Sequence, residues 1–186
     1  MRNGRIQEAS RAFARNAELS RRTNNVGSEG QAYLALSACR IRLFDYRGAQ
    51  QAAEAARGIG LKINNLSTAG GASINLATIY LQLGDSALAA KEAAYAADLL
   101  KNSSNKERLV KALLIYANVE AERSRGRIAA ERGAGDAEAE RKSLDQIERN
   151  YQRGIDAAHA AGLAHLEANL WEEFGYFTPC AVPGES

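Results

Sequence analysis

Residues 70–96, GGASINLATIYLQLGDSALAAKEAAYA, decide the fold, because residues 30–56, GQAYLALSACRIRLFDYRGAQQAAEAA, carry the same pattern 40 positions earlier. The apolar and small residues of the two stretches coincide, and so do the aspartates Asp45 and Asp85. Internal repetition of this period indicates a helical array in which each unit buries its apolar face against its neighbours. We therefore expect an all-α fold, a solenoid of antiparallel helix pairs.

The composition agrees with a helical fold and argues against several classes of partner and location. The chain has 186 residues, 46% of them hydrophobic, and no proline before Pro179. A net charge of +2 argues against nucleic acid or an anionic membrane as the main partner. No apolar run approaches the ~18 residues of a membrane span. Two cysteines, Cys39 and Cys180, make no disulfide framework, so a cytoplasmic protein is expected.

The spacing of apolar residues predicts one domain over residues 1–176, followed by a flexible tail over 177–186. Ser28 is expected to cap the second helix, and Gly58 and Gly60 are expected to end the third. A capping box at Ser104-Asn105-Lys106-Glu107 should open the sixth helix. The predicted helices cover about residues 4–22, 29–44, 46–60, 68–83, 86–101, 105–131, 137–161 and 165–176.

The third helix pair departs from the period, because the sequence between residues 120 and 150 holds an insertion rich in both charges. Opposite charges four residues apart, as in Glu138 with Lys142 and Asp145 with Arg149, support solvated helices. We interpret the insertion as a lengthened, solvated helical hairpin. A docking arm for another domain is the alternative.

The residues from Leu76 to Ala96 resemble the tetratricopeptide repeat (TPR) family. Leu76, Ala77 and Tyr80 match the large, small and aromatic positions of that family's first helix, and Gly84-Asp85 matches its turn. The small residues of the second helix are Ala89, Ala93 and Ala96. The resemblance implies a right-handed solenoid, here with a period near 40 residues in place of the family's usual 34 and without its closing proline.

The amino-acid sequence of the repeats is also similar to that of arrays found in larger bacterial signalling proteins. The stretches LATIYLQLGD (residues 76–85) and RGIDAAHAAGL (residues 153–163) are similar to arrays that precede caspase-like CHAT peptidase domains. They also resemble sensor arrays ahead of diguanylate cyclase or transcriptional-activator domains. The resemblance implies that the chain is the interaction part of a larger protein.

No convergent set of acid, base and nucleophile is visible in the sequence, so we expect no catalytic residues, no cofactor and no metal site. His159 and His165 lie six residues apart across Gly162, which is no recognised metal-ligand spacing. The glycine pairs Gly58-x-Gly60 and Gly70-Gly71 lack the strand and the Lys-Ser/Thr of a phosphate loop.

In TPR arrays the first helix of each pair lines a concave groove, and the resemblance implies the same role here. A protein or peptide partner is therefore expected, with the chain as a non-catalytic scaffold. Self-association through the first helix, where Ile6 and Phe13 lack part of their covering, and a ligand-sensing regulatory domain are the alternatives. The groove positions implied are Gln31, Leu34, Ala38, Arg42, Ile74, Asn75, Thr78, Leu81, Gln82, Lys111, Leu114, Asn118 and Glu122.

Overall fold

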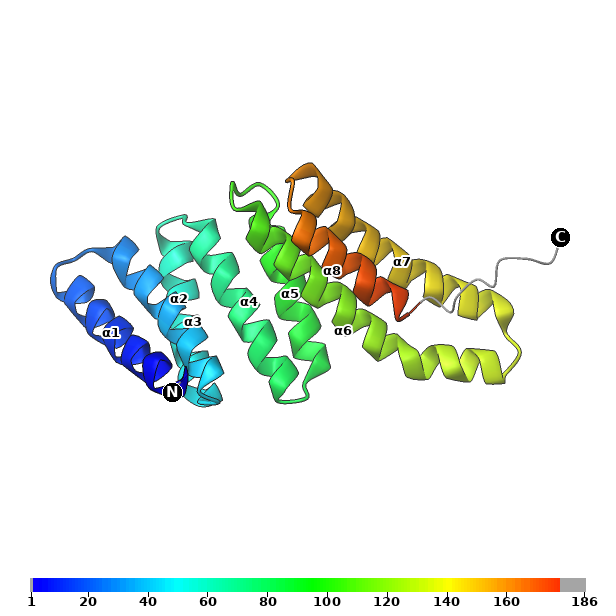
Figure 1. Cartoon of the computed structure of the whole chain (residues 1–186), viewed down its shortest axis with the longest axis horizontal. Coiled ribbons are helices and arrows are strands. Elements are labelled where there is room, and N and C mark those ends of the chain that lie inside the picture. The colour runs from blue at the N-terminus through cyan, green and yellow to red at the C-terminus, as the bar shows by residue number, and fades with distance from the viewer. Residues whose placement is uncertain (1, 178–186) are drawn as a thin grey trace.

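The computed structural model describes residues 2–177, which form eight α-helices, each packed antiparallel against the next (Figure 1). Of the tail expected over residues 177–186, only Phe177 lies within the described residues. The helices are α1 (Arg2–Arg22), α2 (Val26–Arg42), α3 (Tyr46–Lys62), α4 (Leu66–Gln82), α5 (Ser86–Leu100), α6 (Lys106–Gly133), α7 (Ala137–Ala160) and α8 (Ala164–Gly175).

Short turns that share an Asn or Asp N-cap set where helices α2 to α6 begin. Helices α2 to α6 begin at residues 26, 46, 66, 86 and 106, and each follows an Asn or Asp N-cap. In each case the cap's side chain accepts a hydrogen bond from the backbone N–H three residues on, for example Asn65 from Thr68 at 3.0 Å. The predicted caps Ser28 and Ser104 were wrong, because Asn25 and Asn105 hold these positions.

The helices form two layers that differ in how closely they pack. Each helix contacts its successor along the chain, and α2, α4, α6 and α8 also contact one another in sequence. No such contact joins α1 with α3, α3 with α5 or α5 with α7 within residues 2–177. We call α2, α4, α6 and α8 the even layer and the remaining helices the odd layer.

Small residues allow the helices to approach closely. Ala49, Ala53, Ala77 and Ala93 are each 0% exposed. A Cβ atom added at Gly60 would lie 2.7 Å from the backbone nitrogen of Ala69, so only glycine fits where α3 passes α4. The prediction that α3 ends at Gly58 or Gly60 was therefore wrong, since the helix continues to Lys62. Burial against α4 outweighs the poor helix propensity of glycine there.

The third hairpin is lengthened, as predicted. Helices α6 and α7 extend past α8 and turn at residues 134–136, at the right of Figure 1. Lys142 pairs with Glu138 at 2.6 Å, and Arg132 of α6 reaches Glu140 of α7 at 2.6 Å. Arg149 donates to Gln146, and no ion pair with Asp145 is formed. Within residues 2–177, no helix is long and apolar enough to cross a membrane.

Candidate peptide-binding groove

All of the predicted groove residues lie on three helices of the even layer, but they do not all line a hollow. Leu34 of α2 is only 7% exposed and packs against Ala56 and Ala72. Gln31 donates from Nε2 to Oγ1 of Thr68 at 2.7 Å, which ties α2 to α4. At this end of the layer, the predicted residues that line a hollow face α1 instead: Ala38 and Arg42 line one hollow beside α1, and Gln31 lines another.

Hydrogen bonds within the chain engage three of the predicted residues of α4. Nδ2 of Asn75 donates to the backbone oxygen of Leu34 at 3.3 Å, and the Thr78 hydroxyl donates to the backbone oxygen of Ile74 at 3.0 Å. Gln82 accepts from the Tyr46 hydroxyl at 3.4 Å. Each of these residues thus has a partner within the chain. Of the predicted α4 residues, Leu81, 39% exposed, and Gln82 are the exposed ones.

Three predicted residues do come together, where α4, α6 and α8 meet. Leu81, Asn118 and Glu122 line a pocket of about 440 Å³. The buried Val119 and the exposed Tyr176 add apolar surface to it. We call this hollow the α6–α8 pocket; its other lining residues are Arg125, Glu173 and Phe177. The predicted Lys111 and Leu114 do not line it: Lys111 pairs with Glu107, and Leu114 packs against the core between α6 and α7.

A buried tyrosine of α7 contacts residues that line the pocket. Tyr151 is 0% exposed and donates from its hydroxyl to Oδ1 of Asn118 at 2.8 Å. Its ring lies 5.3 Å from that of Phe174 and 6.1 Å from that of Phe177, measured between centroids. Burial raises the pKa of the Tyr151 phenol well above its usual range, so the hydroxyl stays a donor. Asn118 is held with its Oδ1 satisfied, and its Nδ2 donates to no atom among the described residues.

The charges around the pocket are mixed, with an acidic excess. The Arg125 guanidinium lies 4.6 Å from the centroid of the Phe177 ring and pairs with Glu122 at 3.1 Å. Glu173 forms no ion pair with any residue that the structure describes. One arginine against two carboxylates leaves the rim net negative, while its floor is apolar.

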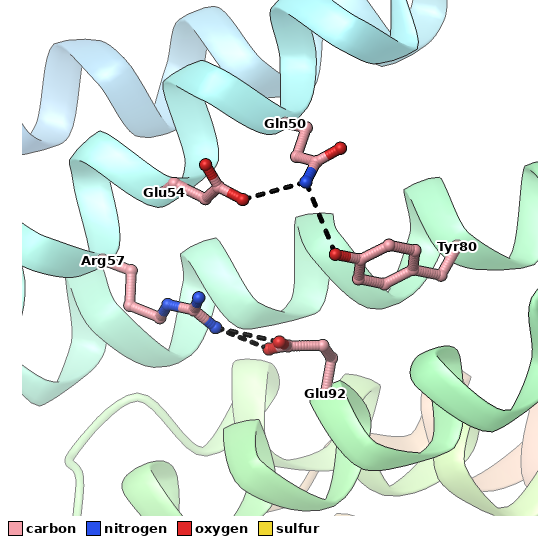
Figure 2. Close-up of polar contacts among 5 residues, drawn as sticks. All are labelled: Gln50, Glu54, Arg57, Tyr80 and Glu92. Atoms are coloured by element: carbon pink, nitrogen blue, oxygen red, sulfur yellow. Dashed lines mark hydrogen bonds and ion pairs between the residues drawn. The ribbon is translucent and has the colours of Figure 1, made fainter.

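A second polar cluster lies where α3, α4 and α5 face one another (Figure 2). Arg57 of α3 donates to both carboxylate oxygens of Glu92 on α5, at 2.8 and 3.0 Å. Gln50 donates to Glu54 at 2.9 Å and reaches the Tyr80 hydroxyl at 3.5 Å. Burial raises the pKa of Tyr80, and the Glu92 and Glu54 carboxylates raise it further. Arg57 and Glu92 pair with each other and Glu54 accepts a hydrogen bond, so we interpret the cluster as a structural link between α3 and α5.

The remaining candidate residues are not gathered into a site. His159 lies 3.3 Å from Glu167 at the surface, and His165 is exposed. Cys39 is half-buried, and burial raises the pKa of its thiol, which disfavours the reactive thiolate. Over residues 2–177, no group of three His, Cys, Asp or Glu side chains is placed to hold a metal ion.

The sequence-based prediction missed the contribution of α8 to the pocket. Glu173, Tyr176 and Phe177 lie at the end of this helix, which was predicted, but the groove was assigned only to the first helices of the three full pairs. The signal available was the position of α8, the helix that follows α7 and thereby continues the even layer. No protein-family model matches the chain, and no curated protein matches it in sequence.

Proposed function

We propose that the chain is a non-catalytic interaction module that binds a peptide or partner helix in the α6–α8 pocket. The observation that carries this proposal is that Leu81, Asn118 and Glu122, chosen from the sequence as groove positions, lie together around a hollow with exposed apolar surface. Apolar surface next to a few convergent polar groups is typical of binding sites.

The contacts suggest what the bound segment contains. Leu81, Val119 and Tyr176 would receive an apolar side chain, and Nδ2 of Asn118 would donate to a backbone carbonyl of the ligand. The unpaired Glu173 carboxylate favours a cationic neighbour. The ligand that we infer is therefore a segment with a large apolar residue next to Lys or Arg.

The packing supports a TPR-like, right-handed solenoid as the scaffold. Helices of the even layer contact one another and those of the odd layer do not, as we expect of an array that curves with the even layer on its inner side. The equal spacing of helix starts from residue 26 to 106 fits repeating pairs. On this proposal the chain acts in the cytoplasm as the docking part of a larger bacterial signalling or CHAT-type protein.

A peptide array that varies the residues around one central position tests the proposal. We expect wild-type protein to retain peptides with Leu, Ile or Phe beside Lys or Arg. Leu81→Glu should abolish retention, whereas the matched control Leu83→Glu should not, because Leu83 is 56% exposed and lies outside the pocket. Glu173→Lys should select against the basic neighbour. Equal retention by the Leu81 and Leu83 variants would refute the assignment.

A further inference from the structure

The two ends of the helix array carry complementary surfaces. At one end, a hollow of about 650 Å³ lies between α1 and α2, and Ala9, Phe13 and Cys39 are among the residues that line it. At the other end, one stripe of α8, made of Ala168, Trp171 and Gly175, is exposed, with Trp171 49% exposed.

The internal repeat shows what covers the first surface elsewhere in the same chain. Forty residues on from Ala9, Phe13 and Cys39 are Ala49, Ala53 and Ile79, each 0% exposed. These residues form a cluster against which Ile41 of α2 packs. The α1–α2 hollow is therefore the place where a helix of the even layer would lie, and no described helix occupies it.

The repeat also shows what covers the second surface. Counted from the helix start, Ala168 of α8 corresponds to Gly30, Gly70 and Val110 of the other even helices. All three are buried, and each faces the odd helix that follows. A Cβ atom at Gly30 would touch Ile59 of α3, and one at Gly70 would touch Leu100 of α5. Val110 packs against core residues of α7. Among residues 2–177 no odd helix follows α8, and the corresponding stripe is exposed.

The charges of the two ends match as well. Helix α1 contains six arginines and two glutamates, and Arg5 and Arg42 border the hollow. Helix α8 contains three glutamates and neither lysine nor arginine. Opposite charge on two surfaces that would meet favours their association and fixes their orientation.

We propose that the chain associates head to tail with a second copy of itself, with α8 of one copy lying against α1 and α2 of the next. The contact would recreate across the interface the even–odd pairing of α2 with α3 and α4 with α5. It joins two different surfaces, so it leaves one free end of each kind and propagates into an open chain of copies. It does not depend on the peptide site proposed above.

Light scattering on the 186-residue chain and two end-blocked variants tests this proposal. Ala9→Arg fills the hollow, and Trp171→Lys places a cation where the basic α1 would dock. Tyr95→Lys, at a residue of α5 that is 39% exposed, is the matched control. Circular dichroism of each variant confirms that its helices are intact.

We expect the mass of wild type and of Tyr95→Lys to rise with concentration up to about 1 mM without stopping at a dimer, and to fall as NaCl is raised. Each end-blocked variant alone should stay monomeric. Mixed together, they should form a one-to-one dimer, because each contributes its intact end. A monomeric wild type, a monomeric mixture, or association that only Ala9→Arg abolishes would overturn the proposal.

Discussion

At the scale of single residues, close approach between helices depends on positions where no side chain fits. A Cβ atom at Gly70 of α4 would lie 2.5 Å from Cγ of Leu100, which is itself 0% exposed and has no space into which to move. We expect Gly70→Ala to lower the free energy of unfolding by about 1–3 kcal/mol. Gly126→Ala is the control, because a Cβ there meets nothing within 4 Å. It should be stabilising by about 0.5–1 kcal/mol. Urea denaturation of the two variants measures both effects, and equal stability would contradict the packing described here.

The buried Tyr151 makes stability depend on alkaline pH. Burial raises its pKa in the folded chain, whereas the unfolded phenol titrates near its usual pKa of about 10. The unfolded state therefore loses this proton first. The stabilisation is complete below about pH 10 and declines as the pH rises above that value. Urea midpoints measured from pH 8 to pH 11 should fall along this course for wild type and more shallowly for Tyr151→Phe. Parallel curves would show that the phenol stays accessible to solvent.

At the scale of the element, one turn holds a non-glycine residue in a strained backbone conformation, whereas the equivalent turn has glycine at that position. Phe44 adopts φ of 60° and its side chain is 74% exposed, while Gly84, at the same position of the next turn between an even and an odd helix, has φ of 79°. Side chains disfavour this left-handed conformation. We expect Phe44→Gly to raise the free energy of unfolding by about 0.5–1 kcal/mol, less the loss of an edge contact with Tyr46. Gly84→Phe should lower it. Thermal unfolding of the pair checks the sign, and a destabilised Phe44→Gly would mean that the aromatic contact dominates.

Helix periodicity was sufficient to predict the number and order of the helices but not their starts. The second and fourth helices begin earlier than predicted, since Gly27, Ser28 and Ser67 in their first turns are poor helix formers that read as loop. Asn25 and Asn65 cap these turns, and tertiary packing then holds them helical. Helix propensity alone missed these starts, because it gives no weight to the local Asn caps and because the packing joins residues of different helices.

Only part of the candidate site could be predicted from the sequence. The repeat alignment located Leu81, Asn118 and Glu122, since groove positions follow from the register of the even helices. It did not locate Tyr176 or Phe177, whose place depends on how the lengthened α6–α7 hairpin returns α8 to the layer. The order of the helices indicated that α8 continues the even layer, but which of its residues reach the pocket is decided by packing.

At the scale of the whole molecule, stability should vary along the array. Helix α4 contacts α2, α3, α5 and α6, and α6 contacts α4, α5, α7 and α8, whereas among residues 2–177 α1 contacts only α2. In an array of this kind each unit is stabilised mainly by its neighbours. We expect backbone amides of α4 and of the N-terminal half of α6 to exchange with deuterium most slowly and those of α1 fastest, in mass-spectrometric measurements at low protein concentration. Uniform protection along the chain would indicate a single cooperative unit.

The unequal packing of the two layers has a mechanical consequence. The even layer is continuous, while in the odd layer the Arg57–Glu92 pair links α3 to α5 across a gap that their backbones do not close. A bending load on the array should therefore compress or open the odd side, with the even side nearly constant in length. Under such a load the Arg57–Glu92 pair limits how far the array opens between α3 and α5. Removing it should make the molecule more compliant at that point than its helix content would suggest.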